Sequence, residues 1–203
     1  MKKMVLVLTL AAFALSGSAF AQDPNWNDNI GMYLTPDGFN APNGTGSCGA
    51  AAENEIFISY LVLSKLTNAE VWGWEAKVIP TNMLFMGDLV YGDHVDAGTR
   101  DHEYIVGLAG PLFAVDRAVV VAEIQYQVNS YYNDINQPSY VAIENIYFHL
   151  LPDAVPAYLE ASGSTGVELH PAIYGPYQLI INGDCNVVAT EEATWGGVKS
   201  LYR

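Results

Sequence analysis

A polar segment at residues 92–103 holds the densest group of side chains able to do chemistry in this chain of 203 residues. It contains two of the four histidines, set among four carboxylates. A three-residue hairpin loop at 97–99 would bring the two imidazoles opposite each other. Imidazole and carboxylate groups together bind Zn²⁺, and carboxylates alone suit Ca²⁺. The candidate metal ligands are Asp93, His94, Asp96, Asp101, His102 and Glu103.

A solvated hairpin without an ion is the alternative for this segment. In the predicted register Asp96 faces Arg100, which would pair two exposed side chains of opposite charge. The sequence has neither the EF-hand loop pattern nor a His-Glu-x-x-His motif, the specific signatures of Ca²⁺ and Zn²⁺ sites. Both interpretations stay open. The same register places His94 opposite His102 and Asp93 opposite Glu103.

A second candidate site is a loop rich in Tyr and Asn that follows residue 128. Tyr and Asn combine rigid contact area with adaptable hydrogen bonding, a composition favoured in recognition loops. Tyr is also common at the margins of β-sandwich cores, where the ring is buried and the hydroxyl is wet. The candidate binding residues are Tyr131, Tyr132, Asn133 and Asp134.

The usual catalytic templates do not occur in the sequence. No Gly-x-Ser-x-Gly motif marks an activated serine, and no Gly-rich loop ends in Lys-Ser or Lys-Thr. A glycosidase needs two carboxylates about 5 to 10 Å apart, a condition that 22 acidic residues meet in many ways on paper. Glu123, Gln125 and Gln127 form a polar stripe that either lines a shallow groove or simply faces solvent. A secreted hydrolase or carbohydrate-active domain therefore stays an alternative function.

Trp72 and Trp74 raise the question of a carbohydrate platform, because exposed indoles stack on sugar rings. A spacing of two places both on one face of a strand, together with Ala76 and Val78. A face shared with aliphatic residues favours a core position over a platform. Carbohydrate and another extracellular protein are the two candidate partners.

The elements that must position these residues are strands almost throughout. Residues 55–66 carry apolar side chains on both alternating faces, which predicts a central strand covered on both sides. Residues 118–128 alternate, with Ala118, Val120, Ile124 and Tyr126 on the inward face. The other predicted strands are 29–34, 71–79, 84–91, 103–108, 143–151 and 177–182, and 152–162 could hold at most one or two helical turns.

Many short strands separated by Gly, Pro, Asn and Asp turns predict an all-β protein built as an antiparallel sandwich with minor helical turns. No internal repeat or low-complexity linker divides the chain. We expect a single domain over residues 22–193, preceded by a signal peptide at 1–21 and followed by a C-terminal tail at 194–203.

The first 21 residues have the features of a cleaved secretory signal peptide. Lys2 and Lys3 precede an apolar run at 4–15, and Ala19 and Ala21 precede the expected cleavage point. The run is shorter than the roughly 20 residues that cross a bilayer, so we expect no transmembrane segment after cleavage. The sequence therefore predicts a secreted bacterial protein, periplasmic or extracellular.

Export to an oxidising compartment allows the two cysteines to form a disulfide. Cys48 and Cys185 are an even pair without metal-ligand spacing, which predicts one disulfide in an oxidising compartment. Two separate free thiols are the alternative.

The charge excludes one class of partner. The chain has 8 Lys and Arg against 22 Asp and Glu, a net charge of −14. Such a surface repels phosphate backbones and anionic lipid, so binding to nucleic acid or to a membrane surface is not expected. It favours cations, basic partners or plain solubility.

Two segments resemble known groups of proteins. Residues 60–63 and 71–76, the second with Trp72-Gly73-Trp74, resemble the opening strands of cohesin-like β-sandwiches. The ending Thr194-Trp195-Gly196-Gly197-Val198-Lys199-Ser200-Leu201-Tyr202-Arg203 is similar to that of a group of uncharacterised exported bacterial proteins. The resemblance implies a cohesin-like sandwich of the jelly-roll or immunoglobulin-like kind and a protein that binds rather than catalyses. It assigns no site residues, and no dockerin-type partner signal is present.

These observations together favour a secreted, non-enzymatic β-sandwich that serves as a binding or structural module of the bacterial exterior. No cofactor is required by this hypothesis, apart from the Ca²⁺ or Zn²⁺ considered for residues 93–103.

Overall fold

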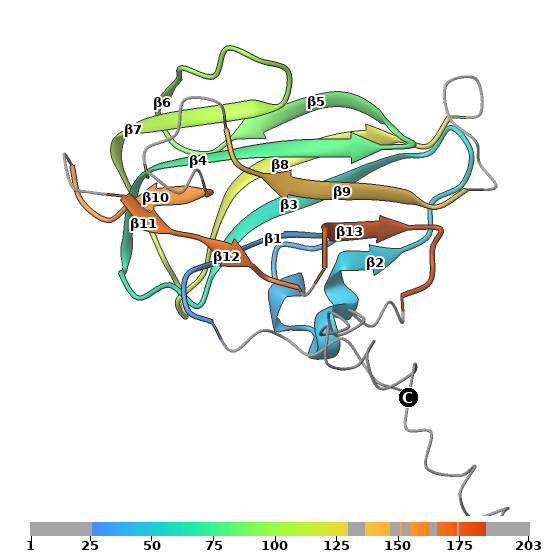
Figure 1. The fold of residues 1–203 in the computed structure, drawn as a ribbon, viewed down its shortest axis with the longest axis horizontal. Coiled ribbons are helices and arrows are strands. Elements are labelled where there is room, and N and C mark those ends of the chain that lie inside the picture. The colour runs from blue at the N-terminus through green and yellow to red at the C-terminus, as the bar shows by residue number, and fades with distance from the viewer. Residues whose placement is uncertain are drawn as a thin grey trace, which may run out of the picture.

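Strands dominate the chain and form two sheets packed face to face (Figure 1). Two 3-10 helices, η2 (Gly38–Asn40) and η3 (Pro42–Ser47), supply the helical turns of the described residues. The predicted β-sandwich is confirmed. None of the helices in the described ranges has the length and apolar character to cross a membrane. The computed structural model describes residues 26–129, 137–146, 151, 155–162, 166–173 and 175–185.

The five-stranded sheet has the strand order β12-β1-β3-β8-β5. β12 runs parallel to β1, and the other neighbouring pairs are antiparallel. β3 lies between β1 and β8, as predicted for a central strand, and β5 is an edge strand. The strands are β1 (Asn29–Tyr33), β3 (Ile56–Ser64), β5 (Leu84–Val90), β8 (Val119–Gln127) and β12 (His170–Pro171).

The eight-stranded sheet has the order β11-β10-β4-β9-β13-β2, with β7 paired to β4 and β6 paired to β7. β13 and β2 are parallel, so both sheets are mixed rather than purely antiparallel. Its strands are β2 (Cys48–Gly49), β4 (Glu70–Thr81), β6 (His94–Asp96), β7 (Glu103–Phe113), β9 (Ser139–Glu144), β10 (Ala157–Leu159), β11 (Gly166–Glu168) and β13 (Tyr177–Ile181).

The main core fills the space between the two sheets. Leu61 and Leu63 of β3, Ile124 of β8 and Leu179 of β13 are all fully buried in it. Burying one such side chain contributes about 1.5 to 3 kcal/mol to stability. The alternation of apolar residues along these strands is therefore what joins the two sheets.

β8 follows the predicted alternation over only part of its length. Its pairing with β3 skips one residue at Val121, which forms a bulge. Ile124 and Tyr126 lie in the main core, whereas Ala118 and Val120 lie in a smaller apolar cluster apart from it. One extra residue moves every side chain beyond it to the other face of the sheet. The prediction that all four residues share one inward face is therefore wrong for Ala118 and Val120.

The two central tryptophans lie in different surroundings. Trp74 is 2% exposed and belongs to the main core, as predicted. Trp72 is half-buried, and its indole Nε1 donates to Glu70 Oε2 at 2.8 Å. The pairing of β4 with β7 is irregular between Val71 and Gly73, and Val71 is also in the core. The prediction of one shared core face is wrong for Trp72, because the irregularity breaks the alternation.

The ninth strand begins earlier than predicted. We expect a strand at 143–151, whereas β9 ends at Glu144, and residues 147–150 lie outside the described residues. The start of β9 does not show the alternation of apolar and polar residues, because its buried first residue, Ser139, is polar. The Ser139 hydroxyl donates a hydrogen bond to Asn82 O at 2.7 Å, which makes its burial possible.

Two other predicted boundaries also differ from the structure. The segment 152–162, for which the sequence allows at most one or two helical turns, contains the strand β10, and residues 152–154 lie outside the described part. β7 continues through Pro111 to Phe113, beyond the predicted end at Leu108. Pro111 is tolerated because β6 pairs with β7 only as far as Leu108, which leaves no ladder bond there for Pro111 to donate.

The predicted disulfide is confirmed. Cys48 at the start of β2 is bonded to Cys185, with the two Cα atoms 5.6 Å apart. β2 also pairs with β13, so the bond joins chain segments that already lie side by side. It closes a loop of 137 residues, for which chain entropy gives a stabilisation of about 4 to 5 kcal/mol.

Candidate functional site

The hairpin of candidate metal ligands has a different register from the predicted one. β6 pairs His94 with Leu108 and Asp96 with Val106, so Asp96 does not face Arg100 across the hairpin. The connection is longer than three residues, because the Asp96 carboxylate accepts the backbone N–H groups of Gly98 and Ile105 at 2.8 and 2.9 Å. These two bonds stabilise the longer loop that follows Asp96. The predicted pairs of His94 with His102 and of Asp93 with Glu103 do not form across this ladder either.

The candidate ligands of this hairpin point into different surroundings. The His94 ring nitrogen Nδ1 is 2.9 Å from Gly92 O, and the His102 ring packs on Phe85 with centroids 4.5 Å apart. Glu103 is buried, whereas Asp93, His94, Asp96 and Asp101 are exposed. Within the described ranges, no three His, Cys, Asp or Glu residues are grouped so as to hold an ion. The metal site at this hairpin therefore stays a prediction that the positions of the described side chains do not support.

The predicted binding loop at Tyr131, Tyr132, Asn133 and Asp134 lies outside the described residues. The polar stripe on β8, in contrast, is well placed. Glu123, Gln125 and Gln127 lie on the face of the five-stranded sheet that is turned away from the core.

Apolar side chains flank this stripe on both neighbouring strands. The register pairs Gln127 with Ile56 and Gln125 with Ile58 on β3, and pairs Glu123 with Leu89 on β5. Ile56, Ile58 and Leu89 are 52, 38 and 57% exposed. We call these six residues the β3-β8-β5 face. No sequence pattern identifies Ile56, Ile58 and Leu89 as one surface, because they come together only through the pairing of β3 and β5 with β8.

A hydrogen bond orders Glu123, the acidic residue of the β3-β8-β5 face. The Tyr91 hydroxyl donates to the Glu123 carboxylate. This bond, followed by burial and by the negative charge of Glu123, raises the pKa of Tyr91 to about 12. Tyr91 therefore stays a neutral donor at physiological pH and holds the carboxylate in place.

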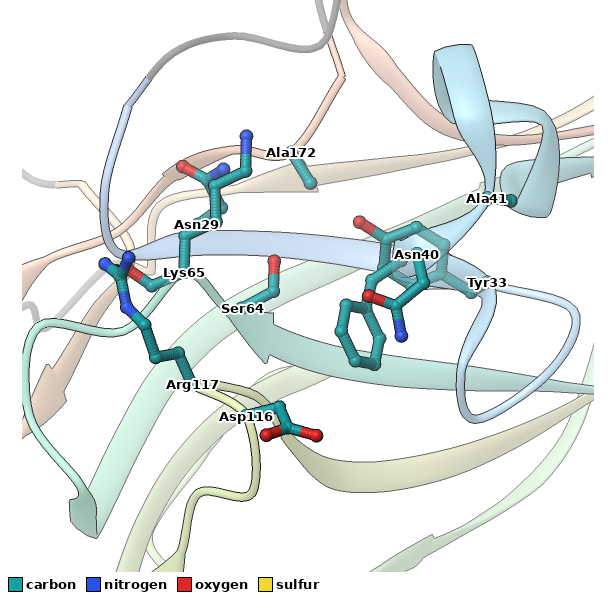
Figure 2. Close-up of a pocket in the computed structure, with 10 residues that line it drawn as sticks. Asn29, Tyr33, Asn40, Ala41, Ser64, Lys65, Asp116, Arg117 and Ala172 are labelled. Carbon is teal, nitrogen blue, oxygen red and sulfur yellow. The ribbon is translucent and has the colours of Figure 1, made fainter.

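A pocket lies on the same sheet, next to η2 and the smaller apolar cluster. Its volume is about 380 Å³. Figure 2 shows Lys65 and Arg117 at one end, Tyr33 and Asn40 at the other, and Ser64 between them. We call it the η2 pocket, and it is lined by Asn29, Tyr33, Phe39, Asn40, Ala41, Ser64, Lys65, Asp116, Arg117 and Ala172.

Sequence reasoning does not single out the η2 pocket. Its residues come from β1, η2, the end of β3, the β7-β8 turn and the segment after β12. They are separated by up to 143 positions between Asn29 and Ala172 and share no motif. The one local signal is the Asp116-Arg117 pair, which forms a two-residue turn between the bridged residues Val115 and Ala118.

The fold is similar to that of solved cohesin modules, and no protein-family model or curated protein sequence matches the chain. The sixth cohesin of scaffoldin B from Acetivibrio cellulolyticus, solved with a Cel5 dockerin mutant, has a TM-score of 0.52 at 9% identity, covering 78% of this chain and 100% of that one. A type II cohesin domain from the same organism gives 0.46 at 12% identity, covering 77% and 96%. The cohesin module of a Clostridium perfringens family 33 glycoside hydrolase gives 0.46 at 8%, covering 78% and 98%. The chain thus has a cohesin-like β-sandwich fold.

Proposed function

We propose that this chain is an exported, non-enzymatic module that binds another protein through the β3-β8-β5 face. The observation that carries the proposal is the exposure of Ile56, Ile58 and Leu89 on the two strands that flank β8. Single exposed apolar residues are ordinary, whereas several that lie near one another on neighbouring strands mark a candidate protein-binding surface.

The charge of the chain indicates what kind of partner fits. With a net charge of −14 and Glu123 on the face, the molecule attracts a partner whose surface is basic around an apolar patch. Such complementarity mainly raises the association rate and disfavours acidic partners. A second copy of this acidic chain is a poorer fit for the same reason.

The comparison with cohesins supports a protein partner. The sixth scaffoldin B cohesin, the one solved with a dockerin mutant, is matched over its whole length. At 9% identity this likeness concerns the fold, so the partner of this chain is to be found by experiment. The predicted signal peptide and the disulfide between Cys48 and Cys185 support an extracellular or periplasmic location.

The alternative of a secreted hydrolase receives less support from the geometry. Among the described residues that line the η2 pocket, one, Asp116, carries a carboxylate. Glycoside hydrolysis uses two carboxylates flanking the bond that is cleaved. This pocket is therefore better suited to binding than to hydrolysis.

The test replaces exposed apolar residues by a charge that a basic, apolar partner surface should not accommodate. Ile58→Lys places a cation at the centre of the face, and Val95→Lys, at a site that is 73% exposed on β6, is the matched control. The mature protein and both variants are immobilised and exposed to the secreted proteins of the source organism. A retained protein is then purified, and its affinity for all three forms is measured by calorimetry.

We expect Ile58→Lys to weaken binding at least about tenfold and Val95→Lys to leave it within about twofold. Equal binding by all three forms would show that the partner uses another surface. Loss of binding in both variants would also contradict the proposal, since it would trace the effect to charge rather than to the face.

A further inference from the structure

The η2 pocket gathers positive charge in an otherwise acidic molecule. Lys65 and Arg117 are two of the four Lys and Arg residues in the described ranges. Arg117 is held in position because its Nε donates to Leu66 O at 2.8 Å and its Nη2 to Lys65 O at 2.6 Å. The pocket thus has two cations against one carboxylate, that of Asp116, so it favours an anion although the chain carries a net charge of −14.

Polar side chains that both donate and accept hydrogen bonds also line the pocket. Ser64 lies between the two ends, and Asn40 projects from η2 (Figure 2). Asn29 is 1% exposed, and its side-chain oxygen accepts no hydrogen bond from the described residues. A buried oxygen without a donor costs about 1 to 3 kcal/mol, and such a group is typically completed by a water or a bound group.

Aromatic rings close the other end of the pocket. Tyr33 and Phe39 pack edge to face, with centroids 6.4 Å apart and an interplanar angle of 74°. They offer an apolar surface next to the Asn40 amide and near the Ser64 hydroxyl. A ligand that fits this order has a negative end, several hydroxyl groups and an apolar ring face.

The charged end of the pocket is built from backbone in an uncommon conformation. Lys65, Asp116 and Arg117 have φ values of 52, 50 and 64°, in the left-handed region where long side chains are rare. Three of the eight such residues in the described part of the chain therefore line this one pocket. For Asp116 and Arg117 this conformation is that of a two-residue hairpin turn, in which both central residues have a positive φ, and the turn fixes where both side chains start.

We propose that the η2 pocket binds a single acidic sugar residue, a ring with several hydroxyl groups and one carboxylate. The volume of about 380 Å³ lies at the small end of the roughly 300 to 1,000 Å³ typical of ligand pockets, which suits one such ring. The carboxylate faces Lys65 and Arg117, the hydroxyl groups face Ser64 and Asn40, and the ring face lies against the aromatic end.

The experiment is a titration of the mature protein with D-glucuronate, followed by NMR chemical shifts, with D-glucose as the neutral match. We expect glucuronate to saturate the protein and glucose to bind at least about fivefold more weakly, because glucose lacks the charge. Raising the salt concentration should weaken glucuronate binding alone.

Three variants assign the binding to this pocket. Lys65→Asn removes the cation with a residue that tolerates a positive φ, and should weaken glucuronate binding about tenfold. Asp116→Asn removes the neighbouring carboxylate and should strengthen it about threefold. Arg100→Gln makes the same charge change as Lys65→Asn in an exposed residue outside the pocket and should leave the affinity within about twofold.

Absence of saturation up to roughly 10 mM glucuronate would overturn the proposal. Equal binding of glucose and glucuronate, or an equal effect of Lys65→Asn and Arg100→Gln, would overturn it as well. None of these variants alters Ile58 or Leu89, so failure here leaves the protein-binding proposal for the β3-β8-β5 face standing.

Discussion

The Tyr104 hydroxyl donates to the Asp88 carboxylate at 2.5 Å and thereby links the two sheets. Tyr104 lies on β7 of the eight-stranded sheet and is 3% exposed, whereas Asp88 lies on β5, the edge strand of the other sheet. Burial, followed by this bond, raises the pKa of Tyr104. An edge strand has a neighbour on one side only, so this contact helps to hold β5 against the body of the sandwich.

Tyr104→Phe should lower the free energy of unfolding by about 1 to 2 kcal/mol, because a buried hydroxyl loses its hydrogen bond to a carboxylate. Tyr91→Phe is the matched control. It removes a bond of the same chemistry to Glu123 on the solvent-facing side of the sheet, and should cost less than about 0.5 kcal/mol. Urea unfolding measures both values. A double-mutant cycle with Asp88→Asn should show coupling, and simple additivity would contradict the link.

Stability should fall as the pH rises above about 10, the ordinary pKa of a tyrosine. The pKa of Tyr91 is raised to about 12 by its bond to Glu123, and burial raises the pKa of Tyr104 and of Tyr126. In this pH range the unfolded chain loses these protons while the folded chain keeps them, so proton release favours unfolding.

The alkaline loss can be assigned to single residues by urea unfolding between pH 9 and about 11.5. Each fully buried phenol adds up to about 1.4 kcal/mol per pH unit to the slope. Tyr104→Phe should make the slope shallower by up to that amount, and Tyr126→Phe should do the same. An unchanged slope in both variants would contradict the burial of these hydroxyl groups.

Tyr126→Phe should leave the stability at pH 7 unchanged or raise it by up to about 1 kcal/mol. The Tyr126 side chain is fully buried, and its hydroxyl makes no hydrogen bond to the described residues. Removing an unsatisfied buried hydroxyl relieves a desolvation cost, while the ring and its packing against Phe57 and Phe85 are kept. A loss of 2 kcal/mol or so by thermal or urea unfolding would show that the hydroxyl has a partner, such as a buried water.

Replacing both Cys48 and Cys185 by Ser should lower the free energy of unfolding by about 4 to 5 kcal/mol, the entropy of closing a loop of 137 residues. Reduction of the parent protein should produce the same loss, and the double variant should not respond to reductant. The pairing of β2 with β13 should survive at low temperature, because its backbone bonds do not depend on the disulfide. A loss below 1 kcal/mol or so would mean that the unfolded chain is already compact.

The strands and the sandwich could be predicted because burial on one side of a strand leaves a period of two in the sequence. β3 and β8 could be predicted for this reason, and the disulfide could be predicted from an even number of cysteines in a chain with an export signal. The short strands β2, β10, β11 and β12 have two or three residues each, too few to show any period. Their pairing depends on long-range contacts rather than on local pattern.

Local irregularities limited the prediction of which side chains face outward. The bulge at Val121 reverses the facing of the start of β8, and a one-residue change of this kind has no signature in the sequence. The hairpin after Asp96 is set by side-chain bonds to Gly98 and Ile105, which lengthen the loop beyond the simplest register. Ile58 and Leu89 share a surface only because both β3 and β5 pair with β8.

Asp28→Asn should cost about 1 to 3 kcal/mol, because this carboxylate ties three segments together at one end of the sandwich. Asp28 is buried, and it accepts the Thr67 N–H at 2.8 Å, the Thr67 hydroxyl at 2.9 Å and the Tyr158 hydroxyl at 2.8 Å. Its φ of 55° is tolerated by Asn, so the variant tests the charge and its bonds rather than the backbone. Tyr158→Phe removes a single donor and should cost about 1 kcal/mol in the same urea experiment. If Asp28→Asn is as stable as the parent, the amide satisfies all these donors and the negative charge contributes nothing to the fold.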